Sequence, residues 1–333
     1  MGGGSWTSSA HEKYEEELRG RGEEHFEYSR VAAESGDFKV HADLDPRKIK
    51  KVRESRDSKE HPNSRAIMVW FDETGSMQRN PELFVGKLPS LMGLLYRHNY
   101  VDDPQILFGA HGDVTSDEVP LQIGQFESDV RMEKNLDRFV LEGQGGPYGQ
   151  ESYELAIYAA ARKTSIDCFE KRGEKGIMFL IGDEEPYPVV SRQAVKAVFG
   201  TTEQSDIPLA QILEEAKEKW MIFFIIPANA SGSDNSTIQR AWSRLLGRQN
   251  VIKLSDSSLI AETIAATIGI VAKGVDSAEV GEHLRETKIS LRDIDTVTKA
   301  VSVIPKGERT AVARSSGSLH GLDKTGRGGV HRL

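Results

Sequence analysis

Apolar residues gather in short, nearly unbroken runs along the middle of the chain, and polar or glycine-rich segments separate these runs. Runs of this kind are typical of strands buried on both faces of a parallel sheet, whereas strict alternation indicates a strand with one solvent face. The continuous runs cover residues 66–71, 106–110, 176–181 and 220–226, an alternating run covers 121–126, and a short one covers 250–254. The pattern therefore predicts about six strands.

Helical periodicity fills the intervals between these strands. Strands that alternate with helices predict a doubly wound α/β fold, with a mostly parallel, Rossmann-like sheet and helices on both faces. The alternating run is expected to pair with residues 106–110 as a hairpin, which adds one antiparallel edge strand. Pro89 is expected to kink or split the first helix. The helical patterns cover residues 83–95, 130–141, 209–220, 237–246 and 257–273, and another follows residue 152.

Two of the continuous runs end in an aspartate, at the place where ligands bind in open α/β sheets. Asp72 follows the first run, and Thr74 and Ser76 come at alternate positions after it, with Gly75 between them. Asp183 follows a later run in the same way. Carboxylate and hydroxyl oxygens suit Mg²⁺, Mn²⁺ or Ca²⁺, so these side chains predict a site for a divalent cation.

The sequence Asp72-x-Thr74-x-Ser76, with a glycine before the last serine and a methionine after it, resembles the metal-ion-dependent adhesion site (MIDAS) of von Willebrand factor type A (VWA) domains. The resemblance covers residues 65–273 in the family's order of elements, and it points to an intracellular bacterial or phage member. It implies that hydroxyl groups and a second loop hold the ion, with the aspartates often acting through water. An ordinary turn rich in small polar residues is the alternative interpretation.

The glycine-rich segment 143–152 corresponds to the second metal loop of the resembled family, where a threonine is the commoner ligand. The spacing to the following helix puts Glu151 at the ligand position, and Ser152 and Tyr148 are the alternatives. Asp183 corresponds to the last aspartate of the MIDAS, although a glutamate replaces the glycine that usually follows it. The resemblance thus implies the ligand set Asp72, Thr74, Ser76, Glu151 and Asp183.

Composition divides the 333 residues into a folded centre and hydrophilic ends. Residues 1–61 are expected to form a charged extension, helical or disordered, and residues 62–274 the VWA-like domain. A short helical extension is expected over residues 275–304. Residues 305–333 have the glycine-, serine- and arginine-rich composition of a disordered basic tail.

Charge and cysteine content narrow the choice of partner and compartment. The net charge of −8 argues against nucleic acid as the main partner. No stretch of about 18 apolar residues is present, so no membrane span is expected. The first residues lack the pattern of a secretory signal, and the lone Cys168 excludes an internal disulfide. These features predict a cytoplasmic protein.

The resemblance implies a non-enzymatic module that binds a protein partner through the ion, with a partner carboxylate at an open coordination position. Bacterial members often work beside AAA+ ATPases of the MoxR type, so such an ATPase is an implied partner. The alternative is a phosphotransferase similar to haloacid dehalogenases and P-type ATPases, with Asp72 as the nucleophile. That alternative lacks the lysine usual in P-type ATPases, because Glu73 follows Asp72. A structural assembly subunit with a vestigial metal site is the third possibility.

Overall fold

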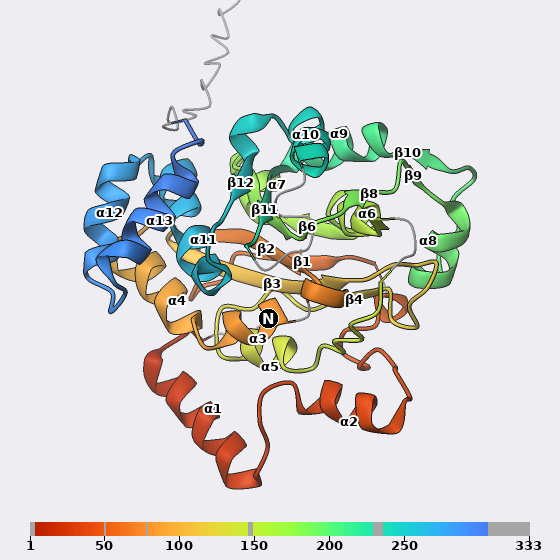
Figure 1. Ribbon diagram of the computed structural model, residues 1–333, viewed down its shortest axis with the longest axis horizontal. Helices are drawn as coiled ribbons and strands as arrows, with labels where there is room; N and C mark the ends of the chain where they lie inside the picture. The colour runs from red at the N-terminus through yellow and green to blue at the C-terminus, as the bar shows by residue number, and fades with distance from the viewer. Residues whose placement is uncertain (1–3, 50, 78, 146–148, 229–235, 306–333) are drawn as a thin grey trace, which may run out of the picture.

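The computed structural model describes residues 4–49, 51–77, 79–145, 149–228 and 236–305, and the side chain of Ser76 lies outside this description. A six-stranded sheet runs through the molecule in the order β12-β11-β7-β2-β3-β4 (Figure 1). All neighbouring strands are parallel except β3 and β4, which are antiparallel. This confirms the predicted fold class, including the antiparallel edge strand. The strands are β2 (Ser64–Asp72), β3 (Asp103–His111), β4 (Leu121–Ile123), β7 (Gly176–Ile181), β11 (Trp220–Ile226) and β12 (Val251–Lys253).

Strand β2 lies in the middle of the sheet and is buried on both faces, as its unbroken apolar sequence predicts. Successive side chains of a strand point to opposite faces, so β2 supplies two separate cores. One core takes Ile67, Val69 and Phe71, and the other takes Ala66, Met68 and Trp70.

Helices cover both faces of the sheet, as predicted (Figure 1). Pro89 lies in the first turn of a helix, so the expected 83–95 helix is split into two. The first core is covered by α3 (Arg79–Val85), α4 (Leu88–Arg97), α5 (Arg131–Leu136) and α11 (Ile260–Ile268). The second is covered by α6 (Tyr153–Arg162), α7 (Asp167–Arg172), α8 (Arg192–Phe199), α9 (Leu209–Lys219) and α10 (Ser236–Leu246).

Helix α5 is shorter than predicted. The periodic pattern over residues 130–141 predicts a helix of twice its length. Beyond the helix, the Val140 amide donates to the side-chain oxygen of Gln122 at 2.9 Å. The Leu141 amide donates to the hydroxyl of Ser29 at 2.8 Å. These tertiary hydrogen bonds replace the bonds that a continued helix would make.

Glycine and tryptophan lie side by side in the sheet at two places. Gly109 on β3 pairs in register with Trp70 on β2, and Gly176 on β7 pairs with Trp220 on β11. A Cβ atom on Gly109 would lie 2.4 Å from the indole of Trp70, and one on Gly176 would lie 2.5 Å from Trp220. The broad ring therefore requires a neighbour without a side chain at both positions.

The amino-terminal extension is ordered over its described part and packs against the domain. It contains α1 (Ser8–Arg21), α2 (Glu27–Ser35), a short 3₁₀ turn (Pro46–Lys48) and β1 (Arg53–Ser55), which pairs with β6 (Thr164–Ile166). Trp6, Phe26 and Leu44 join the first core. The Leu44 carbonyl also accepts a hydrogen bond of 2.9 Å from the amide of Ile123 on the edge strand β4.

The carboxyl-terminal part adds α12 (Ser277–Arg285) and α13 (Leu291–Val301), which pack on each other and on α11. The expected basic tail lies outside the described residues from position 306 onward. No helix within the described ranges is both long and apolar enough to cross a membrane. Outside the site described below, the structure also has β9 (Val189–Val190), which pairs with β10 (Ile207–Pro208), the 3₁₀ turns Arg248–Asn250 and Ser257–Leu259, and a π-helix (Gly269–Lys273).

Candidate metal centre

The three segments with predicted ligands meet at the carboxyl edge of the sheet. Strands β2 and β7 are neighbours, so the loops that follow them start side by side. Asp72 ends β2 and leads into a 3₁₀ turn (Gly75–Met77), and Asp183 comes two residues after β7. The second loop is tied to the third by two short parallel strands, β5 (Gln150–Glu151) and β8 (Glu185–Pro186). This small sheet places Glu151 next to the Asp183 loop.

Asp72 is fully buried and both of its carboxylate oxygens are hydrogen-bonded. One oxygen accepts from the amide of Thr74 at 2.9 Å and from the hydroxyl of Thr74 at 2.5 Å. The other accepts from the hydroxyl of Tyr153 at 2.7 Å. The aspartate therefore fixes the turn that carries Thr74, in the manner of an Asx-turn.

Tyr153 joins the two aspartates, and this role was not predicted from the sequence. Its hydroxyl donates to Asp72 and accepts from the backbone amide of Asp183 at 3.1 Å. A Cβ atom on Gly182 would lie only 1.9 Å from this hydroxyl, so glycine is needed there. Two sequence features could have indicated this contact: Tyr153 is the first residue of α6, and Gly182 directly precedes Asp183.

Glu151 lies beside Thr74 in the interior of the site. The Thr74 hydroxyl lies close enough to the Glu151 carboxyl to lower its pKa, against the effect of burial, and only 3% of Glu151 is exposed. One carboxylate oxygen of Glu151 is buried without any hydrogen-bond partner. Ser152, the alternative ligand, instead accepts from the amide of Val114 at 2.9 Å. Tyr148 and the side chain of Ser76 lie outside the described part of the chain.

Burial and neighbouring acids raise the pKa of both Asp72 and Glu151. Burial raises the pKa of Asp72, and the charge of Asp183 adds to the effect, although hydrogen bonds from Thr74 and Tyr153 oppose it. Burial and the charge of Asp72 raise the pKa of Glu151. The charged groups that act most strongly on these two acids are themselves acids. The site thus holds negative charge that calls for a proton or a cation.

The donor groups suit a small hard cation that keeps part of its water. Across the described ranges, no three His, Cys, Asp or Glu side chains are grouped so that they could hold a metal ion by themselves. The site instead brings together a hydroxyl, from Thr74, and carboxylates, from Glu151 and Asp72. Mg²⁺ is commonly bound through one or two carboxylates and several waters, and this set is of that chemical kind. The unpartnered buried oxygen of Glu151 is the group most in need of such an ion.

His111 lies in the sheet, one residue beyond the predicted strand of residues 106–110. It is the last residue of β3, it pairs in register with Asp72, and it is fully buried. Its ring lies 4.2 Å from the ring of Tyr153, measured between centroids, and neither nitrogen has a hydrogen-bond partner. Burial lowers the pKa of His111 to about 3, so the ring is neutral and packs as an aromatic group.

Two exposed glycines border the site toward solvent. Gly75, Gln144 and Gly145 are exposed, although Thr74 beside them is buried. Gly75 has a φ of 35°, which favours glycine, and its amide donates to the carbonyl of Gln144 at 2.8 Å. A Cβ atom on Gly145 would lie 3.5 Å from Thr74 and 3.6 Å from Glu151.

No protein-family model matches the sequence, and no curated protein matches it significantly. The chain is similar in structure to the pilus adhesin SpaC from Lactobacillus rhamnosus GG, with 10% sequence identity and a TM-score of 0.43, over 65% of this chain and 31% of that one. It is also similar to proximal thread matrix protein 1 from the mussel byssus, with 13% identity and a TM-score of 0.40, over 62% and 45% of the two chains. The chain thus spans less than half the length of either structure. Similarity at this level carries no argument about function.

Proposed function

We propose that this protein is a metal-dependent protein-interaction module, with a Mg²⁺ or Mn²⁺ ion bound at the carboxyl edge of the sheet. The observation that carries the proposal is the buried, unpartnered oxygen of Glu151 beside the hydroxyl of Thr74. An acid in that position is stabilised by a cation, and no basic side chain is prominent among its electrostatic neighbours.

Each residue of the proposed site has a separate task. The Thr74 hydroxyl donates a hydrogen bond to Asp72, so the lone pairs of the Thr74 oxygen can face a cation. Glu151 supplies a carboxylate, while Asp72 and Asp183 contribute negative charge from behind. Tyr153 holds these two aspartates in a fixed relation. A bound ion would offer an electrophilic position to a carboxylate of the partner.

The alternatives are less well supported by the geometry. A phosphotransferase needs a nucleophile that its substrate can reach, yet Asp72 is 0% exposed and both of its oxygens are engaged. We therefore favour a non-enzymatic role. A structural subunit with a vestigial site would show no response to metal, so the experiment below separates it from our proposal. A MoxR-type ATPase partner stays a prediction from the family resemblance.

Calorimetric titration of Mn²⁺ and Mg²⁺ into the full chain tests the metal site. We expect binding in the wild type, and a loss of at least about tenfold in affinity for Thr74→Val, which removes the hydroxyl while keeping the shape, and for Glu151→Gln. Glu174→Gln is the control, because Glu174 is half exposed and pairs with Arg65 rather than with the site. Equal affinity in all four proteins would refute the site.

Capture of partners from a lysate tests the second half of the proposal. Immobilised wild type and Thr74→Val are compared in Mg²⁺ and in EDTA. A protein retained only by the wild type in Mg²⁺ is expected. A partner that binds equally in all four conditions would show that the interaction surface lies elsewhere.

A further inference from the structure

The loop that carries Thr74 is held by the segment of residues 140–144, which follows α5. The Gly143 amide donates to the carbonyl of Glu73 at 3.2 Å. The Gly75 amide donates to the carbonyl of Gln144 at 2.8 Å. The position of this segment therefore determines the position of the residues on both sides of Thr74.

Gln122 on β4 fixes the same segment from the sheet side. Its side chain is fully buried and exchanges two hydrogen bonds with the backbone of Val140, of 2.8 and 2.9 Å. The same amide group donates to the carboxylate of Glu73 at 2.6 Å. One side chain thus connects the edge strand, the 140–144 segment and the loop of the candidate site.

The amino-terminal helices form hydrogen bonds with this segment and with the end of α5 from the other side. We call residues 4–45 the arm. The Leu141 amide donates to the hydroxyl of Ser29 on α2 at 2.8 Å. Asp137, at the end of α5, accepts from the Tyr14 hydroxyl at 2.6 Å and bonds a ring nitrogen of His25 at 2.7 Å.

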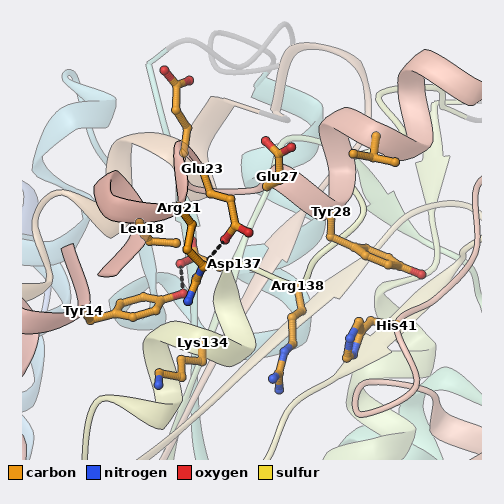
Figure 2. A pocket seen from close by; sticks show the side chains of 12 residues that line it. Tyr14, Leu18, Arg21, Glu23, Glu27, Tyr28, His41, Lys134, Asp137 and Arg138 are labelled. Atoms are coloured by element: carbon orange, nitrogen blue, oxygen red, sulfur yellow. Dashed lines mark hydrogen bonds and ion pairs between the residues drawn. The ribbon is translucent and has the colours of Figure 1, made fainter. Parts of the chain in front are cut away.

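The arm makes further contacts with α5, because Trp6 and His11 both bond the carboxylate of Glu133. Figure 2 shows Tyr14 directed from α1 toward Asp137, while Lys134 and Arg138 line the facing wall of a cavity of about 470 Å³. A second cavity of about 460 Å³ lies between the arm and α3. Figure 1 shows α1 and α2 at the bottom of the view, with α3 and α5 between them and the sheet.

We propose that the arm positions the candidate metal site, by holding α5 and residues 140–144 against the loop that carries Thr74. This inference rests on the function proposed above only for the identity of the ligand. The connection runs from Ser29 to Leu141, then through Gly143 to Glu73, and through Gln144 to Gly75. Release of the arm, by a partner or by modification, would then loosen the site.

Ser29→Ala removes one link without touching the site. Ser35→Ala is the matched control on the same helix, because that hydroxyl donates to carbonyls of its own helix and accepts from the nearby amide of Asp37. Hydrogen exchange of the full chain is read at the amides of Leu141, Gly143 and Gly75. We expect exchange about 2- to 10-fold faster at all three in Ser29→Ala, wild-type exchange in the control, and recovery in Ser29→Thr.

Tyr14→Phe provides a second variant in case the first folds poorly, since it removes only the hydroxyl bound to Asp137. A merely local role for Ser29 would speed exchange at Leu141 alone, and that result would overturn the proposal. Unchanged Mn²⁺ affinity in both variants, with binding in the wild type, would also overturn the proposal. We expect each variant to bind Mn²⁺ about threefold more weakly or worse. If the wild type binds no Mn²⁺, the proposed function fails, and exchange at Gly75 and Gly143 alone decides whether the arm positions the loop.

Discussion

Removal of a single oxygen atom, in Tyr153→Phe, should destabilise the protein far more than its size suggests. The hydroxyl donates to Asp72 and accepts from the amide of Asp183, and all three residues are buried. The variant keeps the aromatic ring against His111 and Trp242, so packing stays nearly constant. The loss would therefore measure the polar connection between the two aspartates.

The expected magnitude follows from the groups left behind. A hydrogen bond to a carboxylate contributes about 1.5–3 kcal/mol, and a buried amide without a partner costs about 1–3 kcal/mol. The two costs overlap because they act on one hydrogen-bond network, so we expect the free energy of unfolding to fall by about 3 kcal/mol. For a domain of this size that lowers the Tm by about 5–10 °C.

Thermal and urea denaturation of wild type and Tyr153→Phe would measure this difference. Tyr158→Phe is the control, because it lies on the same helix and donates to Glu203, whose side chain is 23% exposed and also pairs with Arg162. We expect about 1 kcal/mol or less for that change. A loss for Tyr153→Phe no greater than for Tyr158→Phe would refute the reasoning.

Three further predictions concern the arm, the sheet and the site. Burial opposes the charge of His25, but the carboxylates of Asp137 and Glu15 raise its pKa to about 9. Its protonated form therefore adds at most about 3 kcal/mol to the free energy of unfolding, in full below pH 6.5, and this stabilisation is lost as the pH rises through 9. The unfolding free energies of wild type and His25→Gln should differ at pH 6 and converge at pH 9.5. Gly109→Ala should cost about 2 kcal/mol or more, because its Cβ would overlap the indole beside it, and a Tm within 2 °C of wild type would contradict this. Glu151→Thr should weaken Mn²⁺ binding yet strengthen acetate binding to the loaded protein, since it removes one negative charge; unchanged Mn²⁺ affinity in calorimetry would mean that Glu151 is no ligand.

The strands of the sheet could be predicted from the sequence because each strand is indicated by its own residues. A strand buried on both faces must be apolar throughout, and residues 66–71 and 176–181 satisfy this without reference to any other part of the chain. The split at Pro89 is local as well, since the ring cannot continue a helix. The end of α5 depends on distant residues, because Gln122 accepts from the amide of Val140 and Ser29 accepts from the amide of Leu141.

The candidate site divides in the same way. The Asp72 to Thr74 turn is a short-range motif, and its internal hydrogen bonds follow from the spacing of two residues. Tyr153 reaches Asp72 across 81 positions of the chain. Such a contact depends on how α6 packs over the sheet, and no periodicity encodes it. The burial of His111 likewise follows from the length of β3, which extends one residue beyond the predicted run.

The hydrogen bond between Leu44 and the edge strand has a consequence for self-association. The outward amide of Ile123 is taken by the Leu44 carbonyl, and the outward carbonyl of Ile123 accepts from the guanidinium of Arg53 at 2.9 Å. Free backbone groups on an edge strand are a template for another copy's strand. With these two groups occupied, β4 cannot recruit a neighbouring molecule in that way. A chain shortened past position 53 would expose the pair and should aggregate through new intermolecular β-structure.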